Sequence, residues 1–296
     1  PILAVQTFNK EVAKNSKRSL QKDDEILKFI RVLNNNGIAV ATDLLIGLPG
    51  DTKKSQLESM KKSYKIGFHK TSNADIRLLP SSILETEEQV LKWGIKSKYR
   101  VIPTCYGEYE GHKVIEYEKC IRKTNHMSED DFRYIRLFHG YLFVITYCEF
   151  GRPLMDFARI SSLNIVDLIA SIVETPLKDE YPLLSQFVDF YSSHSDQEWF
   201  ETEDQAQKYY LQDDVFSDMI ENGLPKLNYN FGVKLLVDKS LRREFVNLIA
   251  FNIKQILPNI DPSVIDDVAK FSSHRILNYP LIALNETLEL KSELNH

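Results

Sequence analysis

The sequence predicts an α/β fold in its first part and a mostly α-helical region in its second. Short apolar runs alternate with amphipathic helical stretches over residues 1–80, which is the order that parallel β/α units give. From Ser128 onward the apolar residues recur at helical spacing almost throughout. Hydrophobic residues make up 43% of the chain and charged residues 27%, a composition typical of a globular protein. We therefore expect two domains, residues 1–125 and residues 126–296.

The first region should contain three strands joined by two helices. The first helix has its apolar residues on one face and ends at Gly37, and the second begins at a capping Thr52 or Asp51 and ends near Gly67. A Gly-Leu-Pro-Gly turn closes the middle strand, and Pro80 closes the last. The expected strands are residues 2–7, 38–46 and 75–79, and the expected helices are residues 23–36 and 52–67.

The second region should be helical. Between the two, a short helix over residues 86–93 precedes an extended stretch at 99–103 and a strand-like run over 113–121. Ser128-Glu-Asp-Asp predicts the capped start of a long helix that ends at 151–153. Further helices are expected over residues 165–173, 182–191, 197–222, 231–256 and 262–276. In the 197–222 stretch acidic residues far outnumber the single Lys208, which indicates an amphipathic surface helix or one that docks a partner or gates a substrate.

Composition and spacing exclude several classes of protein. The net charge is −5, and no stretch concentrates Lys and Arg with aromatic residues between them, so we expect no nucleic-acid partner. The longest apolar stretch, residues 137–150, is too short to span a bilayer, so we expect no membrane partner. Cys105, Cys120 and Cys148 are too few and too widely spaced for a disulfide framework, which favours a cytoplasmic location. Zinc-hydrolase, nucleophile-elbow, Walker and dinucleotide motifs are all missing from the sequence.

Small or polar side chains gather on one face of each expected strand. In the second strand Asp43 and Leu45 share a face with two alanines, while the bulky residues share the other. The same alternation places Gln6 beside an alanine and Arg77 on the face of Asp75. Because ligands of parallel β/α units bind at the C-terminal ends of the strands, this face predicts an interior that holds a ligand. The alternative is that Gln6 and Asp43 cap neighbouring loops and that Arg77 pairs with Asp75.

Together these residues resemble a known family. The segments Ala-Val-Gln6-Thr-Phe-Asn-Lys-Glu-Val, Lys17-Arg18 and Thr42-Asp43-Leu-Leu-Ile-Gly-Leu-Pro-Gly-Asp51-Thr, in this order, resemble the second half of the radical S-adenosylmethionine (SAM) core. The resemblance covers residues 1–80 and implies the C-terminal half of a partial (β/α)6 TIM-like barrel. It also implies an enzyme that cleaves SAM reductively at a 4Fe-4S cluster, receives electrons from a flavodoxin or ferredoxin, and acts on an unknown small-molecule substrate.

The resemblance assigns roles to five residues. Gln6 and Asp43 would hydrogen-bond the ribose hydroxyls, since the amide can donate and the carboxylate accepts. Arg18, which alone would be interpreted as a solvated charge, would bind the methionine carboxylate through its planar guanidinium. Leu45 would pack against the adenine. Arg77 has no fixed role in the family and would hold an anionic substrate.

A second resemblance concerns the stretch after the third strand. Arg77-Leu-Leu-Pro-Ser-Ser and Gly94-Ile-Lys-Ser-Lys-Tyr99-Arg100-Val-Ile-Pro103 look like radical SAM proteins that carry an N-terminal cobalamin-binding domain. This implies cobalamin as a further cofactor, with methyl transfer or a related radical step on an unactivated carbon.

The cluster motif of the family, CxxxCxxC, is missing from the sequence. The chain begins at Pro1 inside an apolar run, so we expect a fragment that is inactive alone and whose cluster ligands lie upstream. The competing hypothesis is a non-catalytic module, in which the helical region from Ser128 binds a partner and the α/β part is a degenerate relic. Retention of Gln6, Arg18 and Asp43 together argues against that hypothesis.

Overall fold

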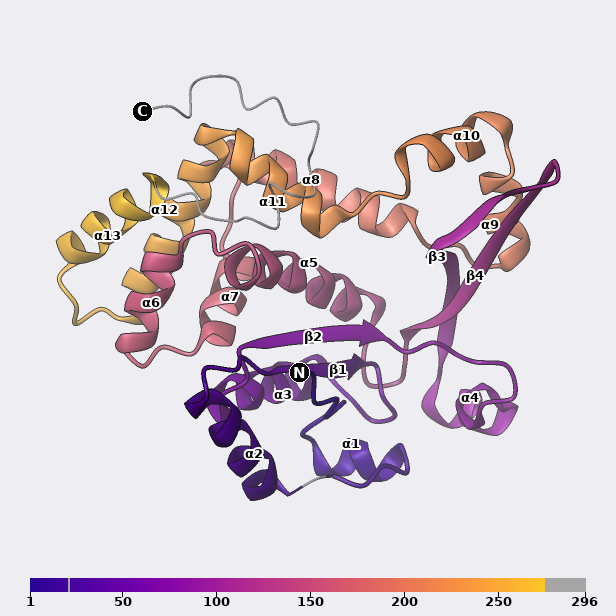
Figure 1. Cartoon of the computed structure of the whole chain (residues 1–296), viewed down its shortest axis with the longest axis horizontal. Helices are drawn as coiled ribbons and strands as arrows, with labels where there is room; N and C mark the ends of the chain where they lie inside the picture. The colour runs from indigo at the N-terminus through magenta and orange to yellow at the C-terminus, as the bar shows by residue number, and fades with distance from the viewer. Residues whose placement is uncertain (21, 275–296) are drawn as a thin grey trace. The chain divides into compact units, whose positions relative to one another are not determined.

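The computed structural model describes residues 1–20 and 22–274, and its elements are labelled in Figure 1. The fold is mixed α/β, with two small two-stranded sheets among the described residues and many helices. Two compact units can be distinguished. One contains Pro1–Leu137 and Asp189–Pro225, and the other contains Phe138–Val188 and the described residues from Lys226. No helix in the described ranges is both long enough and apolar enough to cross a membrane.

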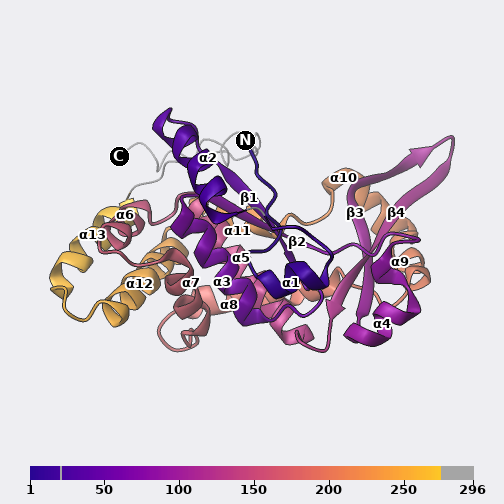
Figure 2. The same ribbon diagram turned by 90° about the horizontal axis from the view of Figure 1, so that it is seen from below.

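Parallel pairing organises the start of the first unit. The strands β1 (Ala41–Ile46) and β2 (Lys70–Asp75) pair in parallel, and α3 (Lys53–Ile66) connects them and packs against both (Figure 2). Residues 1–6 run parallel to the other edge of β1 through isolated bridges, with the Leu3 N–H donating to the Ala41 carbonyl at 2.9 Å. The helices α1 (Lys10–Asn15) and α2 (Asp23–Asn35) lie between this segment and β1 in the chain. Three parallel stretches therefore lie side by side, and the first two are those that the sequence predicts.

The ends of α3 are where the sequence places them. The Thr52 hydroxyl accepts a hydrogen bond from the Ser55 N–H at 3.0 Å, and the Ser55 hydroxyl accepts one from the Thr52 N–H at 2.9 Å. This reciprocal pair is a capping box, which satisfies donors that the first helical turn leaves free. At the other end Gly67 has a φ of 110°, a left-handed conformation that glycine adopts without steric cost.

The third strand lies earlier in the chain than the sequence predicts. The expectation of a strand over residues 75–79 is wrong, because β2 is the polar stretch Lys70–Asp75. The inward side chains of β2 are satisfied by α3: the Thr71 and Ser63 hydroxyls lie 2.6 Å apart, and the Asn73 and Gln56 amides 2.7 Å apart. The apolar residues that follow run antiparallel to a different strand, β4 (His112–Lys123), through backbone hydrogen bonds at Ile76 and Leu78.

A long hairpin makes up much of the remaining first unit. After η1 (Ile83–Glu85) and α4 (Glu87–Trp93), the strand β3 (Lys96–Tyr109) pairs antiparallel with β4. The helices α9 (Glu203–Tyr210) and α10 (Asp213–Asn222) belong to the same unit, and α9 packs against β3. A small apolar core joins these elements: Val101, Ala206, Tyr210, Phe216 and Met219.

The expected single helix over residues 197–222 is wrong, because this stretch contains the end of α8, an extended segment and the two separate helices α9 and α10. Phe200 is extended and exchanges two backbone hydrogen bonds with Tyr99 of β3, each 2.8 Å long. Thr202 then caps a new helix by accepting from the Gln205 N–H at 3.2 Å. Pairing with β3 satisfies the backbone N–H and carbonyl of Phe200 without a helix.

The second unit is helical in its described residues. α5 (Glu129–Thr146) begins in the first unit and ends at Thr146, earlier than the 151–153 that the sequence predicts. Tyr141 on α5 packs against Phe231 and Phe245, with ring centroids 5.7 and 6.2 Å away. The remaining helices are α6 (Arg152–Ile160), α7 (Ile165–Glu174), α8 (Pro182–Gln197), α11 (Leu227–Val237), α12 (Lys239–Ile256) and α13 (Pro262–His274), of which α8 ends in the first unit.

The expected helix over residues 231–256 is two helices. Asp238 separates them, because its carboxylate accepts hydrogen bonds from the N–H groups of Ser240 and Leu241, both at 2.9 Å. Asp238 is therefore the N-cap of α12, which begins as a separate helix at Lys239. The last expected helix is present as α13 to His274, and its expected end at residue 276 lies outside the described residues.

Candidate functional site

The candidate site is built at the end of the leading extended segment. The Gln6 N–H donates to the Asp43 carbonyl at 2.8 Å, and the Leu45 N–H donates back to the Gln6 carbonyl at 2.8 Å. The bridges pair Ile2 with Ala41 and Gln6 with Leu44, so the segment carries one more residue than β1 over the same length. An extra residue of this kind bends a strand and redirects its side chains.

Gln6 has a strained backbone. Its φ is 69°, and the Thr7 N–H donates to the Val5 carbonyl at 2.9 Å, which makes Gln6 the central residue of a γ-turn with positive φ. Such a conformation is rare for a residue with a side chain and costs about 1–3 kcal/mol. Strain of this kind persists where the surroundings hold the residue in place. Strained residues of this type are concentrated at active sites and ligand-binding sites.

The C-terminal end of α1 places Arg18 against the same site. Lys17 has a φ of 53°, and the Arg18 N–H reaches back to the Ala13 carbonyl at 2.9 Å. A left-handed residue followed by this long-range bond is the Schellman motif, which here ends the helix without glycine. The motif turns the chain so that Arg18, Ser19 and Leu20 face the leading segment.

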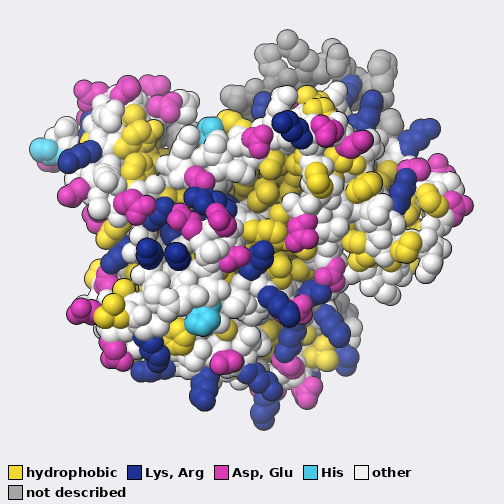
Figure 3. Space-filling view, turned by 180° about the vertical axis from the view of Figure 1, so that it is seen from behind, with side chains coloured by type: hydrophobic (Ala, Val, Ile, Leu, Met, Phe, Trp, Pro, Cys, Tyr) yellow, Lys and Arg dark blue, Asp and Glu magenta, His cyan; other side chains and the backbone are white. Residues whose placement is uncertain are grey.

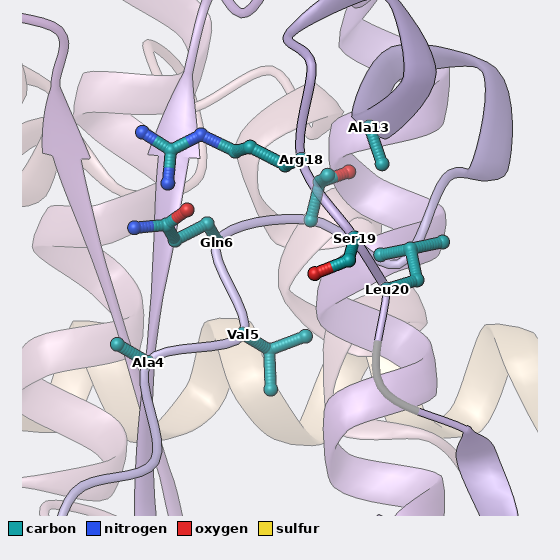
Figure 4. A pocket seen from close by; sticks show the side chains of 8 residues that line it. Ala4, Val5, Gln6, Ala13, Arg18, Ser19 and Leu20 are labelled. Carbon is teal, nitrogen blue, oxygen red and sulfur yellow. The ribbon is translucent and has the colours of Figure 1, made fainter.

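A pocket lies between these two segments (Figure 4). Figure 4 shows the Gln6 amide and the Arg18 guanidinium extending in the same direction from their backbones. Within the described residues, neither side chain has a hydrogen-bond or ion-pair partner in the protein, so both polar ends are available to a ligand. The lining residues are Ala4, Val5, Gln6, Thr7, Ala13, Arg18, Ser19 and Leu20.

Asp43 and Leu45 lie on the half-exposed face of β1, as the alternation of the sequence predicts. Thr42, Leu44 and Ile46 are buried on the other face. The Asp43 carboxylate accepts a hydrogen bond from the hydroxyl of Ser72, its neighbour on β2. Leu45 packs against a hydrophobic cluster of the first unit that contains Leu48 and Ile76. Neither residue lines the pocket that Gln6 and Arg18 share.

Arg77 lies elsewhere and has a partner. Its guanidinium forms an ion pair with Glu118 of β4, whose carboxylate is buried. The alternative pairing of Arg77 with Asp75 is not what the structure has, because Asp75 forms ion pairs with Arg100 at 3.4 Å and with Arg122 at 3.6 Å. Arg77 is therefore engaged in a network of charges.

Two lining residues of the pocket escaped the sequence analysis. Thr7 and Ser19 bring hydroxyl groups to it, and Ser19 is exposed. Hydroxyl residues beside a strand end or a helix end are common as local caps, so the sequence alone gives no signal for either.

The cysteines do not form a cluster site. Among the described residues, no three His, Cys, Asp or Glu side chains come together as metal ligands. Cys120 and Cys148 are buried, and burial raises the pKa of Cys120 to about 12, which keeps its thiol protonated. Because iron is held by thiolates, these residues do not fit a 4Fe-4S cluster.

The structure is that of a mixed α/β protein with a pocket, lined in part by Gln6 and Arg18, beside a short run of parallel strands. Comparison of the sequence with protein-family models gave no match, and a search of curated proteins gave none. The radical SAM assignment therefore remains a prediction.

Proposed function

We propose that residues 1–80 are the SAM-binding half of a radical SAM core and that the chain is part of a radical SAM enzyme. The proposal includes the C-terminal half of a partial (β/α)6 barrel, of which the three parallel stretches would be the last three strands. The observation that carries it is the pocket shared by Gln6 and Arg18, two polar side chains without protein partners. The strained turn at Gln6 adds support, since strain accumulates at functional positions.

In this proposal the residues of the chain bind and orient the cofactor. The Arg18 guanidinium receives the methionine carboxylate through two parallel hydrogen bonds. The Gln6 amide and the Asp43 carboxylate hydrogen-bond the ribose hydroxyls, and Ser72 orients Asp43 through the bond that it donates. Leu45, on the same face as Asp43, covers the adenine. The cluster, when bound, supplies the electron that cleaves SAM.

The cluster ligands have to come from a segment outside the 296 residues, because the three cysteines of this chain do not fit the metal. A flavodoxin or ferredoxin as reductant, a cytoplasmic location and cobalamin as a further cofactor belong to the same proposal, since they rest on the same two resemblances.

The proposal is tested by the coding sequence upstream of Pro1, which should encode CxxxCxxC. The longer protein should contain iron and sulfide and should convert SAM to 5′-deoxyadenosine under reducing conditions. In that protein Arg18→Gln should raise the KM for SAM roughly tenfold or more, because a charge-assisted contact is lost. Lys17→Gln is the matched control and should leave the KM unchanged, since Lys17 does not line the pocket. An upstream sequence without the motif would end the proposal.

A second function, binding of a basic protein partner, is favoured by one observation. The hairpin tip and the two helices beside it, residues 101–117 and 203–222, carry nine acidic residues and two lysines. Figure 3 shows acidic side chains gathered around a hydrophobic strip at this end of the unit. Tyr109 and Ile220 are 64% and 47% exposed there, which would give a partner apolar anchors. A coding sequence without CxxxCxxC would leave this function as the one the chain supports.

A further inference from the structure

Seven charged residues of the first unit form one network, which we call the arginine cluster. Arg100 is its centre: its Nε donates to Glu118 at 2.5 Å, and its guanidinium lies 3.4 Å from Asp75 and 3.6 Å from Glu198. Four guanidinium groups and three carboxylates are joined by these ion pairs, and the carboxylate of Glu129 also acts on Arg122. The members are Asp75, Arg77, Arg100, Glu118, Arg122, Arg136 and Glu198.

Arg122 is buried without adequate compensation. It is 5% exposed, its ion pair with Asp75 spans 3.6 Å, and its Nε is fully buried with no hydrogen-bond partner among the described residues. The Nε of Arg136 is likewise buried and has no hydrogen-bond partner among the described residues. A buried cation with unmade hydrogen bonds is costly, and burial lowers the pKa of Arg122 from its ordinary value for that reason.

Trp199 contacts the guanidinium groups of Arg122 and Arg100 through its indole ring. The guanidinium carbon atoms of Arg122 and Arg100 lie 4.3 and 4.5 Å from the centre of its indole ring. The ring face attracts the cations but accepts no in-plane hydrogen bond. Because all N–H groups of a guanidinium lie in its plane, contact with the ring face leaves the donors of Arg122 other than the one paired with Asp75 without a hydrogen bond to the ring.

The cluster also lies where ligands of parallel α/β folds bind. Asp75 is the last residue of β2 and pairs in register with Ile46, the last residue of β1. The C-terminal ends of parallel strands are the positions from which such folds present side chains to ligands. Arg100, Arg136 and Glu198 keep between a fifth and a third of their side-chain surface exposed, whereas Arg122 is buried.

We propose that the arginine cluster binds an oxyanion group, a carboxylate or a phosphate, which accepts hydrogen bonds from Arg122 and Arg136. The bound group adds a negative charge beside the guanidinium groups of Arg122 and Arg136. This site is separate from the Gln6–Arg18 pocket and does not depend on SAM binding. Its ligand is a small anionic molecule that carries one such group.

Trp199 reports on the site. Trp93→Phe leaves Trp199 as the sole tryptophan of the chain. This variant is titrated with sodium phosphate and, separately, with sodium acetate, while sodium chloride at equal ionic strength serves as the control. We expect a saturable change in Trp199 emission and a rise in melting temperature with at least one oxyanion and not with chloride; the responding salt distinguishes phosphate from carboxylate.

Arg122→Met should weaken the response roughly tenfold or more, because the charge-assisted hydrogen bonds are lost. Arg122→Lys, which keeps the charge but not the planar fork, tests the same point should the methionine variant fail to fold. Arg31→Gln is the matched control: Arg31 is exposed on α2 and is not a member of the arginine cluster, so its loss should leave the titration unchanged. No saturable response to either oxyanion, or equal responses with and without Arg122, would overturn the proposal and leave the cluster a purely structural network.

Discussion

The hydroxyl of Ser55 donates a hydrogen bond to the carboxylate of Asp51 in the turn that begins α3. Asp51 is 1% exposed, and it also accepts from the Thr52 N–H at 3.0 Å. Burial raises the pKa of Asp51 to about 6, above the ordinary value of 3.8, although these two hydrogen bonds oppose the shift. The folded protein therefore holds this proton more tightly than the unfolded chain does.

This shift predicts a pH dependence with a definite sign. The contribution of Asp51 to stability is complete below about pH 4 and is lost as the pH rises to about 6. Asp51→Asn keeps the hydrogen-bond acceptor without the charge, so at pH 7.5 it should be more stable than the natural chain by on the order of 2 kcal/mol. Urea unfolding of both proteins between pH 4.5 and 7.5 measures this. Equal stability differences at all pH values would contradict it.

The turn at Gln6 predicts an unusual order of variants. Gln6→Gly should be more stable than Gln6→Ala by about 1 kcal/mol, because glycine adopts positive φ freely while alanine keeps the strain. Both variants lack the amide, so the comparison isolates the backbone. Guanidinium unfolding decides the matter, and an alanine variant as stable as the glycine variant would show that the turn is not strained.

Gly47 and Gly37 form a matched pair. Both have positive φ, but a methyl group on Gly47 would lie 2.6 Å from the Phe132 ring, whereas nothing lies within 4 Å of one on Gly37. Gly37→Ala should cost about 1 kcal/mol for the backbone, and Gly47→Ala about 1–3 kcal/mol more for the clash. Adding Phe132→Leu to Gly47→Ala should recover part of that excess. Additive effects of the two changes would contradict this explanation.

In the second unit Asn252 links α7 to α12. Its side-chain oxygen accepts from the hydroxyls of Ser171 at 2.5 Å and Thr175 at 3.0 Å, and its NH2 donates to the Leu248 carbonyl at 2.9 Å. Asn252→Ala should destabilise the protein by about 2–3 kcal/mol, because buried polar groups lose their partners. Asn247→Ala, on the exposed face of the same helix, should change stability by less than about 0.5 kcal/mol. Comparable losses in both variants would refute this role for Asn252.

The sequence correctly predicted the features of the structure that depend only on neighbouring residues in the chain. Thr52 and Gly67 mark the ends of α3 because capping and left-handed termination depend on a few neighbouring atoms. The alternation of β1 also held, since Thr42, Leu44 and Ile46 are buried and Asp43 is not.

The errors arose where partners distant in the chain decide. The polar sequence of β2 does not predict a strand, because its inward side chains are satisfied by Ser63 and Gln56 of α3 and not by an apolar core. The sequence around Phe200 predicts a helix, whereas in the structure Phe200 is extended and pairs with Tyr99 of β3. At the candidate site, the sequence pointed to Gln6 and Arg18, which share a pocket, but nothing in it revealed that Arg77 has Glu118 as a partner.

The polar contact between α3 and β2 has an evolutionary consequence. Ser63 is joined to Thr71, and Gln56 to Asn73, at an interface that in most such folds is filled by aliphatic side chains. Losing one member of a buried pair leaves the other unsatisfied, whereas exchanging both for apolar residues of similar shape is nearly neutral. In relatives of this protein, positions 63 and 71 should therefore vary together, as should positions 56 and 73, with single changes rarely tolerated.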